Sequence, residues 1–188
     1  MKRLLTVAVL LFFPMLGNAQ KDLEKLTIMI LPDSELIISG STNVNKFDCK
    51  FNIELITNEK QIKYTQEDNL INFSNLKLNL LTEGFDCGNK RMNSDFQDLL
   101  QCEKYPEIVI ELDRIESISA EYIKAYVIVH LAGKSNTYNL PVIIDKDRFK
   151  GKFKMNIRDF GLEPPTKAFG LIEVDEIIEV QFNLKVLR

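Results

Sequence analysis

Apolar and polar side chains alternate along most of the chain after residue 24, and this alternation constrains the fold more than any other feature. The clearest segments are Phe149–Ile157 and Ile178–Val186, where nearly every second residue is apolar. Successive side chains of a β-strand point to opposite faces, so these segments predict strands with one buried and one solvated face. About eight such segments, joined by short turns, predict an all-β fold in which one antiparallel sheet closes into a barrel. A two-sheet sandwich shares the pattern, but the long, even strands favour the barrel.

The stretch Phe85–Pro106 departs from the alternation and predicts one short helix. Ser94, followed three residues later by a glutamine, matches a capping box at a helix start. Phe96, Leu99 and Leu100 then recur at the spacing of one helical turn, which places them on one apolar stripe. We therefore expect a short helix that plugs one end of the barrel.

Three other segments interrupt or modify the strands. Phe47–Leu55 alternates throughout and predicts a single half-buried strand. Residues 58–69 are polar and predict a turn, and residues 161–170, which contain two adjacent prolines, predict a long loop. Apolar residues fall on odd positions at 71 and 73 but on even positions at 76, 78 and 80. This change of phase predicts a β-bulge near Ser74, or a break between two strands.

The N-terminus has the features of a signal peptide. Lys2 and Arg3 precede the apolar run Leu4–Leu16, which is shorter than the roughly 20 residues of a membrane-spanning helix. Gly17 and Ala19 supply the small residues that a signal peptidase requires. We expect a signal peptide at residues 1–19 and one mature domain at residues 20–188. The mature protein is then periplasmic or secreted and does not span the membrane.

The composition argues against several classes of function. The formal net charge is −3 and basic residues are interspersed with acidic ones, so a nucleic-acid partner is not expected. The single histidine, His130, cannot form a two-histidine metal site, and the alternation places it on the charged face. Asp145 and Asp147 lie in a turn without the ligand spacing of a calcium loop. We expect neither an enzyme nor a bound metal or cofactor.

The three cysteines are Cys49, Cys87 and Cys102. Cys49 and Cys87 each end a Phe-Asp-Cys triplet, and in an oxidising compartment two of the three thiols can pair. We expect a Cys49–Cys87 disulfide, which would tie the segment before the plug helix to a strand of the wall. The alternatives are a Cys87–Cys102 bond or three free thiols. Cys102 itself is expected on the buried side of the helix.

The polar sequence Arg158–Gly161 allows two interpretations. The arginine could contact the head group of a ligand at the mouth of the barrel. Alternatively, an ion pair ends a strand here, and Gly161 adopts a backbone conformation that other residues avoid. The structural interpretation is the preferred one.

Several segments between residues 25 and 187 resemble, in the same order, the motifs of the YceI-like family. No single segment is decisive, but their order along the chain makes the resemblance specific. The segments are Gly40–Phe47, Asp95–Leu100 with Glu103–Ile108, Leu131–Gly133 with Asn139–Val142, Met155–Gly161 and Val174–Ile178.

The resemblance implies a lipocalin-like barrel in the bacterial periplasm that holds a long isoprenoid- or quinone-like molecule. This chain departs from the family pattern in three respects. It contains no tryptophan, it has Lys90–Asn93 where members often carry a histidine-containing loop, and it adds the pair Cys49 and Cys87. These departures concern the ligand and leave the fold unchanged.

Two functions are compatible with these features. In the first, the barrel is a carrier whose inner face encloses an isoprenoid- or quinone-like lipid. In the second, large side chains fill the interior, and the protein is a scaffold or interaction module. The residues expected to line the ligand cavity are Phe51, Ile53, Leu78, Ile110, Val127, Val129, Leu140, Phe153, Met155, Val180, Phe182 and Leu184.

Overall fold

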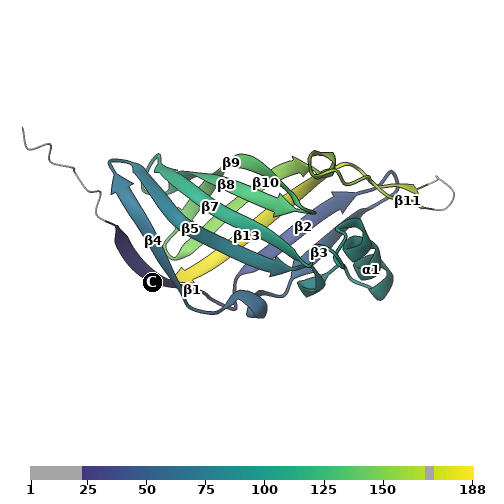
Figure 1. Ribbon diagram of the computed structural model, residues 1–188, viewed down its shortest axis with the longest axis horizontal. Helices are drawn as coiled ribbons and strands as arrows, with labels where there is room; N and C mark the ends of the chain where they lie inside the picture. The colour runs from purple at the N-terminus through teal and green to yellow at the C-terminus, as the bar shows by residue number, and fades with distance from the viewer. Residues whose placement is uncertain (1–22, 168–171) are drawn as a thin grey trace, which may run out of the picture.

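The computed structural model describes residues 23–167 and 172–188, so the expected leader at residues 1–19 lies outside the described residues. Within the described part, eight antiparallel strands pair side by side until the last meets the first, which closes the sheet into a barrel. Figure 1 shows this barrel from the side. The predicted fold class is therefore confirmed. In ring order the strands are β1 (Glu24–Ile30), β4 (Lys60–Glu67), β5 (Leu70–Leu81), β7 (Glu107–Ser117), β8 (Tyr122–Leu131), β9 (Lys134–Asp145), β10 (Arg148–Asn156) and β13 (Ile177–Leu187).

β13 connects the ring to a side branch of the wall. One edge of β13 pairs with β10 along most of its length. The other edge pairs first with β2 (Glu35–Ser41) and then, near the chain end, with β1 at Val186 and Leu187. β2 continues into β3 (Lys46–Phe51) and the short β6 (Phe85–Asp86). The wall thus has two separate branches on this side, one through β1 and β4 and the other through β2, β3 and β6.

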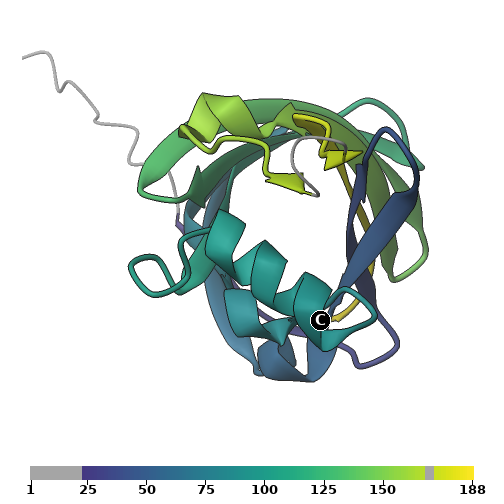
Figure 2. The same cartoon turned by 90° about the vertical axis from the view of Figure 1, so that its right-hand side faces the viewer.

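The helix α1 (Lys90–Leu99) lies across one end of the barrel (Figure 2). The predicted plug is thus present, but its predicted start at Ser94 is wrong. The side-chain oxygen of Asn89 accepts a hydrogen bond from the backbone N–H of Met92 at 3.0 Å and begins the helix one turn earlier. Asparagine caps a helix as well as serine does, because its oxygen satisfies one of the free N–H groups of the first turn. Cys102 lies beyond the helix end, half-buried and unpaired.

The segment before α1 is held by a second set of hydrogen bonds. The side-chain oxygen of Asn93 accepts from the backbone N–H of Cys87 at 2.7 Å. The Asp86 carboxylate accepts from the N–H of Gly88 at 2.9 Å and from the Asn93 amide at 3.2 Å. These hydrogen bonds, the one from Gly88 foremost, lower the pKa of Asp86. The start of the plug is therefore fixed to the wall strand β6.

The structure differs from the sequence prediction in three segments. β3 ends at Phe51, because the Asn52 side chain caps a 3₁₀ turn, η1 (Ile53–Ile56), by accepting from the N–H of Glu54. The polar segment assigned to a turn contains β4, and the expected long loop contains the short strand β11 (Thr166–Lys167), which pairs with β12 (Ile172–Glu173). The remaining 3₁₀ turns are η2 (Thr82–Gly84) and η3 (Ile157–Phe160).

The bulge expected from the change of phase is present in β5. The register between β5 and β7 shifts between Asn72 and Leu76, and Asn75 has a φ of 62°. Asparagine tolerates this left-handed conformation better than most residues. The bulge lets the apolar residues on both sides of it face the interior, because it restores their common phase.

The structure contains the predicted disulfide between Cys49 of β3 and Cys87, and both residues are buried. Cys49 belongs to the inner face of the wall, and Cys87 precedes the plug helix. The bond therefore joins the wall covalently to the segment that carries α1.

Replacing both Cys49 and Cys87 with alanine should lower the free energy of unfolding by roughly 2–4 kcal/mol, because the bond closes a loop with a sequence separation of 38 residues. Urea denaturation under oxidising conditions measures the change. The variant Cys102→Ala is the control and should lose much less, since Cys102 is unpaired. A double variant as stable as the unmodified protein would contradict this role of the bond.

Candidate ligand-binding cavity

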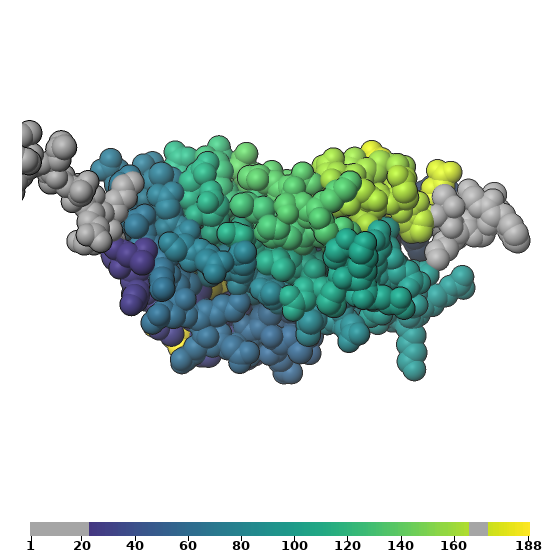
Figure 3. Space-filling model, in the orientation of Figure 1, coloured from purple at the N-terminus to yellow at the C-terminus, as the bar shows by residue number. Residues whose placement is uncertain are grey.

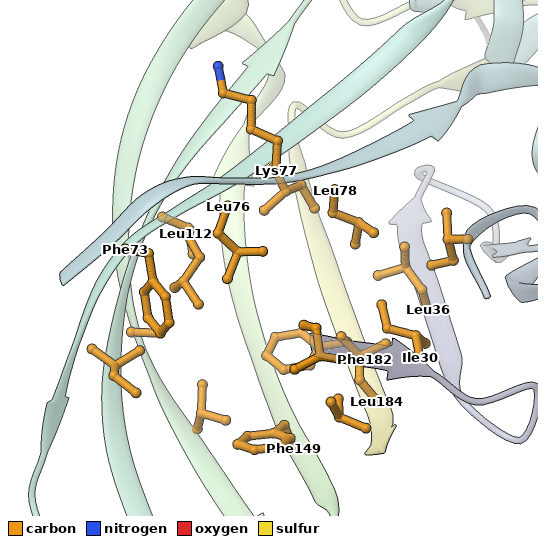
Figure 4. Close-up of a pocket in the computed structure, with 18 of the residues that line it drawn as sticks. Ile30, Leu36, Phe73, Leu76, Lys77, Leu78, Leu112, Phe149, Phe182 and Leu184 are labelled. Carbon is orange, nitrogen blue, oxygen red and sulfur yellow. The ribbon is translucent and has the colours of Figure 1, made fainter. Parts of the chain in front are cut away.

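The barrel encloses a cavity of about 270 Å³ on the side away from α1. Among the described residues, all those that line it are apolar except Asn58, Lys60 and Lys77. Figure 4 shows apolar side chains from several strands pointing toward one space, among them those of Phe73 and Phe182. Figure 3 shows the outer wall, in which a small yellow area of the C-terminal strand is visible between blue residues. The interior is thus a hollow apolar chamber in this half of the barrel.

The cavity is lined mainly by every second residue of the strands, because successive side chains of a strand point to opposite faces. On β8, Ile123, Ala125 and Val127 face inward and are buried, while the residues between them face outward and are more exposed. The other strands of the ring contribute in the same way. β-branched and aliphatic side chains dominate the lining, so the cavity wall offers an occupant dispersion contacts and almost no hydrogen bonds.

Most of the residues expected to line a ligand cavity face the interior. The larger cavity contains eight of the twelve in its wall, and two more lie on a second, smaller cavity of about 40 Å³ beneath α1. Those on the larger cavity are Leu78, Ile110, Val127, Leu140, Phe153, Val180, Phe182 and Leu184, and those only on the smaller one are Val129 and Met155.

The structure places Phe51 and Ile53 away from both cavities. Phe51 packs on Phe85, with ring centroids 5.0 Å apart, and Phe85 in turn packs on Phe96 of α1 at 5.3 Å. Ile53 is buried within η1. Phe51 therefore helps to seat the plug, and the turn at Asn52 explains why Ile53 leaves the strand alternation.

The two cavities are separated by a layer of side chains shared by both walls. Leu36, Ile110, Phe153 and Val180 line the larger and the smaller cavity alike. Phe153 has the largest side chain of the four, and its ring lies against Tyr138 with centroids 5.4 Å apart. Phe153 therefore forms the main part of the floor of the larger cavity.

The Tyr138 hydroxyl is buried and has no hydrogen-bond partner among the described residues. Burial raises the pKa of Tyr138, and the negative charge of Asp159 raises it further. The hydroxyl is therefore protonated at neutral pH. It is a donor near the floor, although Tyr138 does not itself line either cavity.

The polar residues singled out from the sequence are engaged by the chain itself. Arg158 pairs with Glu176 at 2.7 Å and with Glu163. The hydrogen bond that the Arg158 guanidinium donates to the Glu176 carboxylate is the main reason that the pKa of Arg158 is raised. Gly161 has a φ of 73°, as the structural interpretation requires. These contacts favour an ion-paired strand end over a head-group contact.

His130 lies on the outer face of β8. Its Nδ1 is 2.7 Å from the Ser135 hydroxyl, and its Nε2 is 3.5 Å from the Glu111 carboxylate. The residues that the structure describes contain no group of histidine, cysteine or acidic side chains that could hold a metal ion. In the same part of the chain, no helix is long and apolar enough to cross a membrane.

The sequence did not point to Asn58, Lys60 and Lys77 as residues of the cavity wall. Asn58 and Lys60 belong to the polar segment for which the sequence predicts a turn, and Lys77 lies on the outward positions of β5. Ile62 is an apolar residue in this polar segment, and Lys60 lies two residues before it. In a strand this spacing places both side chains on the same face, so it could have indicated that Lys60 faces the cavity.

A closed antiparallel barrel with an apolar chamber defines a class of proteins that bind apolar ligands in their interior. Residues 34–186 match the model of the YceI-like domain, and the chain belongs to the YceI-like family. Members of this family are binding proteins for apolar ligands and are typically periplasmic. No match was found among curated proteins.

Solved structures share the fold. The BcnA protein of Burkholderia cenocepacia is 16% identical with a TM-score of 0.64, and the match covers 82% of this chain and 96% of BcnA. The YceI protein of Campylobacter jejuni is 20% identical with a TM-score of 0.51, over 62% of this chain and 74% of that one. At these identities the likeness establishes the barrel architecture.

Replacing Phe153 with alanine should join the two cavities and lengthen the chain that the protein accommodates. Each additional buried CH₂ contributes roughly 0.8 kcal/mol, so affinity rises with chain length until the cavity is full. Calorimetric titration with n-alkanols should show this plateau at a longer chain for Phe153→Ala than for the unmodified protein. The control is Phe182→Ala, which enlarges the larger cavity without reaching the smaller one. A plateau at the same length in Phe153→Ala and Phe182→Ala would show that Phe153 is not the floor.

Proposed function

We propose that this protein is a periplasmic carrier that holds the apolar part of an isoprenoid- or quinone-like lipid inside its barrel. The observation that carries the proposal is the cavity of about 270 Å³, in which only Asn58, Lys60 and Lys77 interrupt an apolar lining. Family membership supports an apolar ligand. Binding of this kind requires no reactive side chain.

The size of the cavity limits how much of a ligand is enclosed. An eight-stranded barrel is just wide enough to hold one small ligand. The cavity of about 270 Å³ lies just below the roughly 300–1,000 Å³ typical of ligand pockets. The cavity therefore accepts a short apolar chain or the end of a long one. With few polar groups facing inward, the affinity depends mainly on the number of buried carbon atoms.

Two features support an exported protein. The first is the charged and apolar start of the sequence, residues 1–19, which has the pattern of a signal peptide. The second is the Cys49–Cys87 bond, because disulfides persist in the periplasm and outside the cell and are rare in the cytosol. An exported carrier for a lipid shields an apolar chain from water between membranes.

Native mass spectrometry of protein purified from its own host tests the proposal. The unmodified protein should carry an apolar adduct that organic solvent extracts in a ratio of about one per chain. The variant Ala125→Phe should lose the adduct, because its new ring occupies the cavity. The variant Lys124→Phe, on the outer face of the same strand, should keep it.

Two results would contradict the carrier function. One is protein that is always recovered empty and does not bind isoprenoid alcohols or quinones when these are added. The other is an adduct that Ala125→Phe retains in full while remaining folded. The first result would favour the scaffold function.

A further inference from the structure

The wall of the barrel opens sideways between β4 and β5. These strands pair only near their hairpin, where Tyr64–Glu67 face Leu70–Phe73. Beyond the bulge at Asn75, β5 pairs with β7 alone, and the first half of β4 pairs with β1 alone. Two strand edges therefore face each other without backbone hydrogen bonds between them. This gap, which we call the side opening, lies beside the larger cavity, because Leu76 and Ile62 both line that cavity.

One side chain crosses the side opening. Lys60 lies on the same face of β4 as Ile62, which is buried and faces the cavity, so Lys60 also faces inward. Its ammonium group donates a hydrogen bond of 2.7 Å to the backbone carbonyl of Lys77 on β5. A half-buried lysine thus replaces the missing strand pairing at this point.

The ammonium group of Lys60 is bonded to a neutral carbonyl and not to a carboxylate in the part of the chain that the structure describes. Among the described residues no carboxylate lies within ion-pair distance of it, and the cavity lining contains no aspartate or glutamate. The ammonium of Lys77 points away from the cavity, as Figure 4 shows, and pairs with Glu111 at 3.2 Å on the outer face. A lysine ammonium carries three donors, and the bond to the carbonyl of Lys77 uses one of them.

We propose that Lys60 binds the anionic end of the ligand, a phosphate or a carboxylate, in the side opening while the apolar chain fills the cavity. This inference rests on the proposed carrier function and specifies the class of lipid. A charge-assisted hydrogen bond is about twice as strong as one between neutral groups, so an anionic oxygen competes well with the carbonyl that Lys60 now contacts. The exposed side chain of Asn58, on the same rim of the cavity, adds a neutral donor.

The position of Lys60 also determines the orientation of the ligand. The polar end lies at the side of the barrel, between β4 and β5, and neither at the plug nor at the opposite end. Figure 3 shows the yellow C-terminal strand through a gap among the blue residues of this wall. The polar end can thus stay in contact with water while the chain is buried.

Three probes with the same tail test this inference: farnesol, farnesoic acid and farnesyl phosphate. The unmodified protein should bind the two anions at least about tenfold more tightly than farnesol, a difference of about 1.4 kcal/mol. The variant Lys60→Met keeps the apolar stem and removes the charge, so it should bind all three probes with similar affinity. The variant Lys63→Met, on the outer face of β4, is the control and should keep the preference.

The possible results separate this inference from the function on which it rests. Equal binding of all three probes by the unmodified protein, or a preference that survives in Lys60→Met, would overturn the role of Lys60 and leave the carrier function intact. Failure of every probe to bind would overturn both. Inorganic phosphate alone should not displace farnesyl phosphate at millimolar concentration, because it lacks the tail; displacement would indicate a phosphate site independent of the cavity and would contradict the proposal.

Discussion

The hollow interior depends on the closure of the sheet through β13. The ring closes by only two residue pairs between β1 and β13, at Met29 and Ile30, whereas β10 pairs with β13 along nine residues. This short closure leaves the β1–β4 branch free to diverge from β5 beyond the bulge at Asn75. The closure of the sheet thus produces the cavity, and the small number of β1–β13 residue pairs allows the side opening. Both features follow from hydrogen-bond register, which fixes which side chains face inward.

The two halves of the barrel interior are built differently. In the half next to α1, Phe51, Phe85 and Phe96 pack in a row and the disulfide fixes the plug to the wall, so little space remains. In the other half, mainly aliphatic and aromatic side chains line the larger cavity. Phe153 stands at the boundary. The closely packed half next to α1 therefore closes one end of the larger cavity.

The sequence predicted the barrel, the plug helix, the bulge and the disulfide, because each depends on a local pattern or on spacing. It missed β4, whose inward positions carry Lys60, Ile62 and Tyr64 and thus include only one aliphatic residue. It also missed the Asn89 cap, because Ser94 offered an equally valid pattern. The size of the cavity could not be predicted at all, since it depends on the register of all the strands around the ring.

The proposed carrier function requires an apolar ligand inside the chamber of the barrel. Methyl NMR spectra of the protein saturated with farnesol locate the bound ligand through nuclear Overhauser effects between ligand and protein. Farnesol in the cavity should give contacts to the methyl groups of Ile123 and Val142, which line the cavity. It should give none to those of Ile128 and Ile143, which lie on the outward positions of the same strands. Contacts confined to the outward methyl groups would show that farnesol binds outside the barrel.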